Sequence, residues 1–196
     1  MARSGRVVAG IAGGIQLAAA GSGTRPLADR VKQAVFGSLE PVLAGAAILD
    51  LCAGSGAGAI EALSRGAARA VLVERDAGAS TVIRENLRRT GLAAAATVVR
   101  RDAVAALRDP ALRGDRFDIA IVDPPYRETA LRDTLLALLG AIDAPLREGA
   151  TVVVTAYWRE PPPDAVGLLR STRVRRFGET AITFYRRDPG GVAAAD

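Results

Sequence analysis

The protein has 196 residues, 49% of them hydrophobic, which is enough to bury one substantial core in one domain with small additions. Its net charge of +5 indicates an anionic partner such as nucleic acid, although 25 of its 26 basic residues are arginine and compositional bias on a solvated surface is the alternative. The chain has no histidine and one cysteine, which excludes His-based general bases, His metal ligands, an internal disulfide and multi-cysteine metal sites. The sequence contains no run of 18 apolar residues, so it predicts no membrane span. We expect a cytoplasmic protein without a metal site.

Residues 1–44 predict an accessory N-terminal extension. Two short apolar pieces at 6–9 and 15–18, separated by glycines, favour a small β-hairpin. Apolar residues then recur at helical spacing over 27–39, and Pro41 is expected to end that helix.

The stretch 47–63 predicts a buried strand, a glycine turn at Gly54-Ser55-Gly56 and a helix in one continuous piece. Such a turn directs backbone N–H groups and a helix N-terminus at a ligand above the edge of the sheet. Asp50 lies at the carboxyl end of this strand, where its charge would repel a pyrophosphate and attract an ammonium or sulfonium group. This favours S-adenosylmethionine over a dinucleotide. Cys52 lies inside the turn with no base near it, and we do not expect it to be a nucleophile.

Strands and helices alternate through the rest of the chain. Strands are expected at 70–73, 96–99, 117–122 and 151–155, with a final pair at 172–177 and 181–185, and helices at 76–91, 102–107 and 128–142. This order predicts an α/β fold with a Rossmann-like parallel sheet and helices on both faces, in a domain that spans 45–187. Residues 188–196 are expected to be a disordered tail.

Four acidic residues, Asp50, Glu74, Asp102 and Asp123, come at the ends of expected parallel strands and should converge on one edge of the sheet. The spacing of Glu74 from the glycine turn suits an acid that binds both hydroxyls of an adenosine ribose. Asp102 is equally suited to bind the adenine amino group or to cap a helix. The residues expected to bind the cofactor are Asp50, Ala53, Gly54, Ser55, Gly56, Glu74, Arg75, Asp102 and Ala103.

The most specific motif is Asp123-Pro124-Pro125-Tyr126, which we interpret as a catalytic turn. The two prolines lack N–H donors and leave carbonyl acceptors in a stiff bend. The Asp123 carboxylate and the Pro124 carbonyl together suit an exocyclic base amine, because accepting both of its hydrogens directs its lone pair at an electrophile. Tyr126 is expected to stack on the extruded base. The alternative is an ordinary strand-to-helix turn.

Basic residues outside these motifs suggest further contacts. Arg25 and Arg30 flank the start of the N-terminal helix, where they suit a phosphate or a carboxylate. An arginine run at 170–176 usually means a solvated face, with phosphate contact as the alternative.

The motifs together resemble the bacterial RsmD family, which methylates the N2 amine of one guanine in 16S rRNA. The resemblance runs over about residues 5–187 and rests on Arg25-Pro26, the segment 48–57, the segment 61–67, the motif 123–126 and Gly178-Glu179-Thr180. It implies a class I methyltransferase fold whose seven-stranded sheet has an antiparallel final pair, S-adenosylmethionine as donor with S-adenosylhomocysteine as product, and a partly assembled small ribosomal subunit as substrate. The implied substrate-binding residues are Arg25, Pro26, Arg30 and Tyr126, and we expect a monomer.

This chain departs from the family pattern at three places. Leu27-Ala28 replaces two threonines, Gly58-Ala59 replaces Leu-Gly, and the hairpin lacks the usual basic residues, which puts its RNA affinity in doubt. Two other functions therefore stay open. One is an NAD(P)-dependent oxidoreductase, because 54–59 fits a loose dinucleotide fingerprint and Arg75 suits a 2′-phosphate. The other is an rRNA-binding assembly factor without catalysis.

Overall fold

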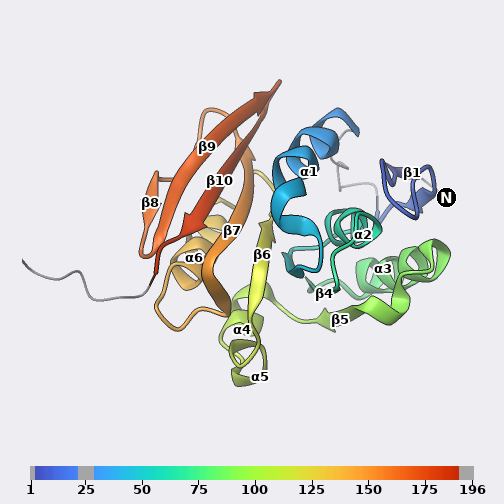
Figure 1. The fold of residues 1–196 in the computed structure, drawn as a ribbon, viewed down its shortest axis with the longest axis horizontal. Helices are drawn as coiled ribbons and strands as arrows, with labels where there is room; N and C mark the ends of the chain where they lie inside the picture. The colour runs from blue at the N-terminus through green and yellow to red at the C-terminus, as the bar shows by residue number, and fades with distance from the viewer. Residues whose placement is uncertain (1–2, 22–28, 190–196) are drawn as a thin grey trace, which may run out of the picture.

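The computed structural model of the protein describes residues 3–21 and 29–189, and an eight-stranded sheet forms its centre (Figure 1). Along the sheet the strands follow the order β5 (Ala96–Arg100), β4 (Arg69–Glu74), β3 (Ala47–Leu51), β6 (Phe117–Val122), β7 (Leu146–Tyr157), β10 (Thr180–Arg187), β9 (Leu169–Phe177) and β8 (Ala165–Val166). The first five are parallel, and β10 pairs antiparallel with both β7 and β9. This is the class I methyltransferase sheet that the motifs imply, with the two-residue β8 added at the edge.

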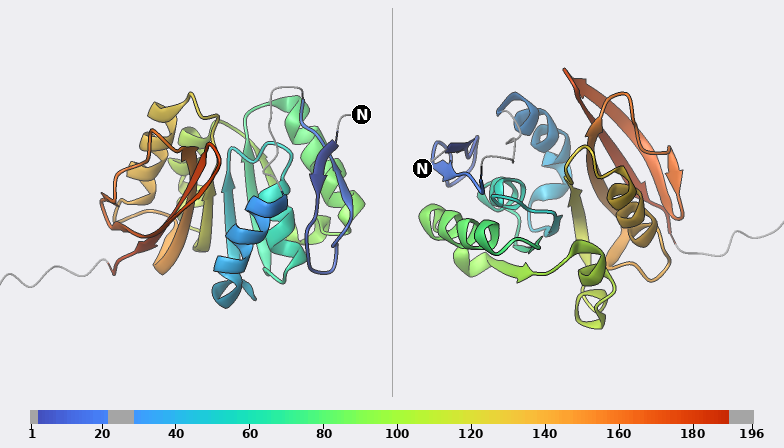
Figure 2. Two further views of the ribbon diagram at one scale, coloured as in Figure 1. Left: turned by 90° about the horizontal axis from the view of Figure 1, so that it is seen from above. Right: turned by 180° about the vertical axis from the view of Figure 1, so that it is seen from behind.

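Helices cover both faces of the sheet (Figures 1 and 2). One face carries α1 (Asp29–Leu43), α2 (Ala57–Ser64) and α3 (Ala77–Thr90), and the other carries α4 (Ala103–Leu107), α5 (Pro110–Arg113) and α6 (Thr129–Leu139); a short 3-10 turn, η1 (Ala93–Ala95), precedes β5. Because side chains alternate along a strand, Ile48 of β3 packs under the first group and Leu49 under the second. Within the described residues, no helix is long and apolar enough to cross a bilayer.

Most of the expected helices and strands are present. Their observed ends show where the local sequence was sufficient to predict a boundary. Helix α3 begins after Asp76, whose carboxylate accepts the Ala79 N–H at 2.7 Å, and it ends at Gly91, which has a φ of 73°. The predicted end at Pro41 is wrong: α1 continues through Pro41 to Leu43. Leu43 is only 2% exposed, so burial of its side chain compensates for the hydrogen bond that proline cannot donate.

Helix α6 is shorter than the expected 128–142. It ends at Leu139 because Gly140 lies against the backbone of Val166, where a side chain would meet the Val166 carbonyl oxygen at 2.2 Å. Ile142, at the end of the expected helix, lies beyond α6 and is 74% exposed. At the end of the chain, Asp188 still donates its N–H to Leu168, and residues 190–196 of the expected tail lie outside the described part.

The N-terminal hairpin pairs β1 (Arg3–Arg6) with β2 (Gln16–Ala18) and lies beside α2 and α3 (Figure 1). Residues 7–14, part of which was expected to be strand, instead fold over α2. The carboxylate of Glu61, which is fully buried, accepts the N–H groups of Val8 at 2.7 Å and Ala9 at 3.1 Å. Gly10 fits so closely that an added Cβ would lie 1.8 Å from the Ser64 carbonyl oxygen. Buried polar groups of α2 thus take hydrogen bonds that strand pairing would otherwise provide.

Glu61 should therefore contribute to stability through the hairpin. We expect Glu61→Ala to lower the free energy of unfolding by about 3 kcal/mol, because two backbone N–H groups and the Arg65 guanidinium lose their buried acceptor. Urea denaturation measures the change. The matched control is Glu40→Ala on the exposed side of α1, which should cost less than about 0.5 kcal/mol. Equal losses in the two variants would contradict an anchoring role for Glu61.

Candidate active site

The parallel strands place the four acidic residues along one edge of the sheet. Strand β3 pairs with β4 on one side and β6 on the other, so Asp50, at the fourth position of β3, lies between the ends that carry Glu74 and Asp123. Asp102 follows β5 beyond β4. The order along the edge is therefore Asp102, Glu74, Asp50 and Asp123.

The glycine turn between β3 and α2 has the tight geometry that its sequence favours. Gly54 and Gly56 have φ values of 56° and 78°, a region that side chains avoid. Cys52 adopts a φ of 63° in spite of its side chain. The Ala53 N–H bonds to Val73 of β4 at 3.0 Å, and the Gly56 N–H bonds to Ala53 at 2.7 Å. The turn is thus attached to the neighbouring strand before the helix starts at Ala57.

Asp50 is 2% exposed and accepts the Ala59 N–H of α2 at 2.9 Å. Burial raises the pKa of Asp50 to about 7, and the nearby charges of Asp123 and Glu74 raise it further against the effect of the Ala59 hydrogen bond. No group of acids among the described residues has the arrangement of a metal site. Within residues 3–21 and 29–189, Asp50, Glu74 and Asp123 form no ion pair, so the acidic edge is uncompensated by cations of the protein and would attract an organic cation.

Glu74 closes the glycine turn onto the end of β4. One carboxylate oxygen accepts the Gly54 N–H at 2.8 Å and the other accepts the Asp76 N–H at 2.8 Å. Each oxygen keeps a second lone pair that is free to accept a ligand hydroxyl. The neighbouring Arg75 pairs with Glu128, just before α6, at 3.0 Å. Its guanidinium is thus directed at a carboxylate rather than at a phosphate.

Asp102 has the capping geometry that was one of its two expected roles. Its carboxylate accepts the Ala105 N–H at 3.0 Å and begins α4, whose first residue, Ala103, is buried. Asp102 is exposed and lies on the rim of an open hollow of about 490 Å³ beside α4 and α5. That hollow is not lined by Asp50, Glu74 or Asp123.

The turn at Asp123-Pro124-Pro125-Tyr126 follows β6 directly. Asp123 accepts a hydrogen bond from the hydroxyl of Thr155, on β7, and burial raises the pKa of Asp123. The Pro125 carbonyl accepts the Glu128 N–H at 2.8 Å, whereas the Pro124 carbonyl accepts no hydrogen bond from the described residues 3–21 and 29–189. A carboxylate and a vacant carbonyl acceptor thus occupy adjacent positions at the edge of the sheet.

Two threonines that sequence reasoning gave no role support this turn. The Tyr126 hydroxyl lies 2.5 Å from the Thr180 hydroxyl of β10, which fixes a ring that is 36% exposed. Thr180 was part of the family resemblance, so its motif was a usable signal. Thr155 had no comparable signal, because its contact with Asp123 depends on the pairing of β6 with β7.

The other residues considered from the sequence are Cys52 and those at or just before the start of α1. Arg25 and Pro26 lie outside the described residues, and Arg30 is exposed in the first turn of α1. Burial and the neighbouring carboxylates, Glu74 first, raise the pKa of the Cys52 thiol to about 12. The thiol is therefore protonated at neutral pH and is a poor nucleophile.

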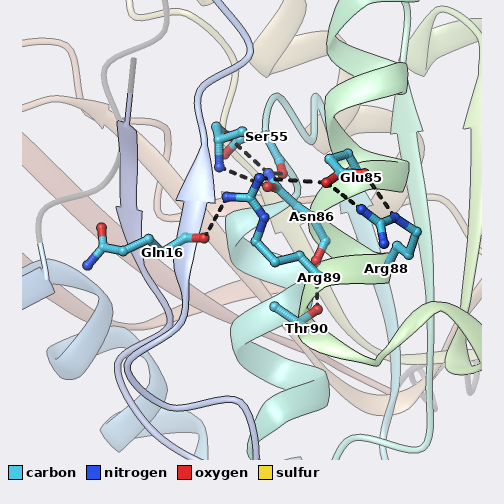
Figure 3. Close-up of polar contacts among 8 residues, drawn as sticks. Gln16, Ser55, Glu85, Asn86, Arg88, Arg89 and Thr90 are labelled. Atoms are coloured by element: carbon cyan, nitrogen blue, oxygen red, sulfur yellow. Dashed lines mark hydrogen bonds and ion pairs between the residues drawn. The ribbon is translucent and has the colours of Figure 1, made fainter. Parts of the chain in front are cut away.

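Asn86 of α3 connects the hairpin to the glycine turn, as Figure 3 shows. It is fully buried; its amide oxygen accepts the Ala18 N–H at 2.8 Å, and its amide nitrogen donates to the carbonyls of Ala18 at 3.0 Å and Ser55 at 2.9 Å. Glu85, next to it, faces outward and pairs with Arg88. One side chain thus fixes the position of Ser55 relative to β2.

Comparisons with known proteins agree with this geometry. The family model described as "Conserved hypothetical protein 95" matches residues 5–186. The Bacillus subtilis protein YlbH is 39% identical over 185 residues, which cover 93% of this chain and 98% of YlbH. Ribosomal RNA small subunit methyltransferase D of Escherichia coli is 36% identical over 174 residues, covering 89% of this chain and 85% of that protein. The solved structure of the Escherichia coli protein yhhF has a TM-score of 0.83 and 31% identity, covering 95% of this chain and 99% of that chain. The chain therefore belongs to the "Conserved hypothetical protein 95" family, the RsmD family that its motifs resemble.

Proposed function

We propose that the protein transfers a methyl group from S-adenosylmethionine to the exocyclic N2 amine of a guanine in 16S rRNA, on an assembly intermediate of the small ribosomal subunit. The observation that carries the proposal is the uncompensated acidic edge directly beside the acceptors Asp123 and Pro124. The name of the Escherichia coli relative, a small-subunit rRNA methyltransferase, supports the substrate class. The enzyme would act as a monomer in the cytoplasm.

The residues along the edge fit a sulfonium cofactor. Asp50, with its pKa raised by burial and by like charges, gains most from a nearby positive charge. Glu74 keeps lone pairs for ribose hydroxyls, and the exposed carboxylate of Asp102 is available to an adenine amine. Ala53, Gly54, Ser55 and Gly56 present the backbone to the ligand, with Arg75 and Ala103 at the borders of the site. When bound, S-adenosylmethionine supplies an electrophilic methyl group.

The catalytic turn orients the nucleophile. An exocyclic amine is weakly nucleophilic because its lone pair is delocalised into the base. The Asp123 carboxylate accepts one amine hydrogen and the Pro124 carbonyl accepts the other, which aligns the lone pair with the methyl group. Positioning then contributes most of the catalysis. The amine becomes positively charged as the carbon–sulfur bond breaks, and it then loses a proton along its hydrogen bond to the Asp123 carboxylate and on to solvent, so no strong base is required beforehand. Tyr126, held by Thr180, stacks on the base, and Pro125 keeps the bend rigid.

Specific contacts argue against the two alternative functions, an NAD(P)-dependent oxidoreductase and a non-catalytic rRNA-binding protein. A dinucleotide site would need Arg75 free for a 2′-phosphate, but Arg75 pairs with Glu128. It would also bring a pyrophosphate to the buried carboxyl of Asp50. A non-catalytic rRNA binder would have no use for the vacant Pro124 carbonyl beside Asp123. Titration with NADPH and S-adenosylmethionine side by side separates the first rival, and rRNA binding without transfer of labelled methyl would identify the second.

Asp123 tests the catalytic assignment. We expect Asp123→Ala to lower methyl transfer by about 100-fold or more, because a preorganised acceptor for the amine is lost. Asp123→Asn keeps a neutral carbonyl acceptor but loses the negative charge that stabilises the developing positive charge on the amine, so it should also lower transfer, by a smaller factor. Binding of S-adenosylhomocysteine should change by no more than a few-fold. The assay is transfer of labelled methyl to 16S rRNA from cells that lack the gene, with mass mapping of the modified guanine. Asp143→Ala, an exposed aspartate after α6, is the control and should keep full activity. If Asp123→Ala were as active as the control variant, the catalytic role of Asp123 would be refuted.

The raised pKa of Asp50 predicts a pH dependence of cofactor binding. A bound cation favours the ionised carboxyl and lowers its pKa, so binding below pH 7 must release a proton. We therefore expect affinity for S-adenosylmethionine to rise from pH 6 to pH 8, by about 10-fold for one group with a pKa near 7. Isothermal titration calorimetry in buffers of different ionisation enthalpy measures both the affinity and the proton release.

Two controls separate this effect from other titrations. Asp50→Asn keeps an acceptor for the Ala59 N–H and should remove most of the pH dependence. S-adenosylhomocysteine lacks the positive sulfur and should show a smaller dependence with the unaltered protein. The same pH profile in Asp50→Asn would mean that another group is responsible.

A further inference from the structure

A cluster of aromatic and arginine side chains lies at the end of β7, outside the site described above. The guanidinium carbon of Arg176 lies 3.5 Å from the ring centroid of Trp158, and that of Arg159 lies 4.9 Å from it. Tyr157 meets the same indole edge-on, with ring centroids 6.4 Å apart. Arg159 and Arg176 are both exposed. The cluster therefore presents two stacked cations to solvent on a rigid aromatic base.

The strand pairing places this cluster next to the catalytic turn. Strands β6 and β7 are parallel, so the carboxyl end of β7 reaches the same edge of the sheet as Asp123. Thr180 pairs with Tyr157 across β7 and β10 and also contacts the Tyr126 hydroxyl. The Trp158 N–H bonds to the Glu179 carbonyl at 3.0 Å. The cluster and Tyr126 are thus connected through the first residues of β10.

The segment that carries the cluster is fixed from the other side as well. Arg132 of α6 is 6% exposed and donates to the Glu160 carbonyl at 2.5 Å. Only the side chains that project from this segment are free to meet a ligand. Its geometry is therefore formed before any partner binds, which lowers the entropic cost of binding.

No carboxylate of the described residues neutralises the charges of the cluster. Elsewhere, arginines such as Arg65, Arg69 and Arg75 pair with carboxylates. Within the described residues, Arg159 and Arg176 form no ion pair, and neither does Arg127 beside Tyr126. Arg176 uses its Nε to bond the Gly178 carbonyl at 2.9 Å, which leaves its terminal nitrogens as donors. Both guanidinium groups are therefore open to solvent and available to an external anion.

We propose that Trp158, Arg159 and Arg176 form a contact surface for the rRNA strand that flanks the target base. Stacking holds each guanidinium flat while its N–H groups remain available to phosphate oxygens, and interleaved aromatic and basic groups suit single-stranded nucleic acid. An acidic protein partner would satisfy the charge, but it would not explain why the cluster adjoins the turn that receives a base. The surface supplies the phosphate contacts that the weakly basic hairpin lacks. This inference rests on the proposed function.

The test is the double variant Arg159→Ala/Arg176→Ala, with 16S rRNA from cells that lack the gene as the probe, both free and in small-subunit particles. We expect rRNA affinity to fall by about 10-fold or more, and the slope of log affinity against log salt to fall by about 1.4, that is about 0.7 for each of two lost contacts with a single strand. Methyl transfer should show a raised KM for rRNA with a kcat close to that of the unaltered protein. Binding of S-adenosylhomocysteine should not change.

Two further variants make the result specific. Arg116→Ala/Arg186→Ala removes two exposed arginines from the opposite edge of the sheet, where β6 begins and β10 ends, and should leave the salt slope and the KM unchanged. Arg159→Lys/Arg176→Lys keeps the charge without the flat stacked group, so it should restore the salt slope but only part of the affinity.

The outcomes distinguish this inference from the function on which it rests. If the double alanine variant binds and methylates rRNA as the unaltered protein does, the contact surface is refuted and the methyltransferase assignment stands. If the control pair weakens binding equally, the effect is one of net charge and the surface is again refuted. If the unaltered protein neither binds nor methylates rRNA, whether free or in small-subunit particles, the proposed function itself fails, and this inference fails with it.

Discussion

The structure depends most on the convergence of carboxyl groups where the parallel strands end. Strands β4, β3 and β6 terminate side by side, which brings Glu74, Asp50 and Asp123 together in a chain whose net charge is otherwise positive. At Asp50, the hydrogen bond from Ala59 does not offset burial and the neighbouring charges, and the pKa of Asp50 stays raised. A fold that keeps such groups at a cost in stability is storing electrostatic energy that a cationic ligand can release. Selectivity for a sulfonium compound therefore follows from the topology of the sheet as much as from any one residue.

Local sequence signals were sufficient where an element depends on its own residues. The glycine turn at 54–56 and the cap at Asp76 were predictable because positive φ values and free helix N–H groups demand particular side chains. Long-range contacts decided the rest. Pro41 does not end α1 because Leu43 is buried against the core. Residues 8–12 leave the strand because Glu61 accepts the N–H groups of Val8 and Ala9, and Ser64 accepts those of Ile11 and Ala12. No local pattern reports these partners, which lie tens of residues away.

The same division holds in the site. Strand ends and the motif at 123–126 predicted correctly that these residues share one edge of the sheet, because parallel strands align their carboxyl ends. The contacts that fix each group were not visible in the sequence. Thr155 meets Asp123 only through the pairing of β7 with β6, and Arg75 meets Glu128 only across the end of β3. Asp102 had two possible roles, and capping of α4 is the one that its contacts display.

The two halves of the sheet support the two reactants separately. On the parallel side, Asn86 fixes the carbonyl of Ser55 and with it the turn that would hold the methyl donor. On the antiparallel side, Thr180 of β10 holds Tyr126, in the turn with Asp123 and Pro124 that we propose as the acceptors of the amine. The two arrangements meet at the pairing of β3 with β6, where Ile121 lies opposite Asp50. Since the rate of an in-line transfer falls steeply with misalignment, the rigidity of this one strand pair sets how well donor and acceptor can be aligned. Accessory contacts at either end of the sheet can then change substrate affinity without disturbing the chemistry.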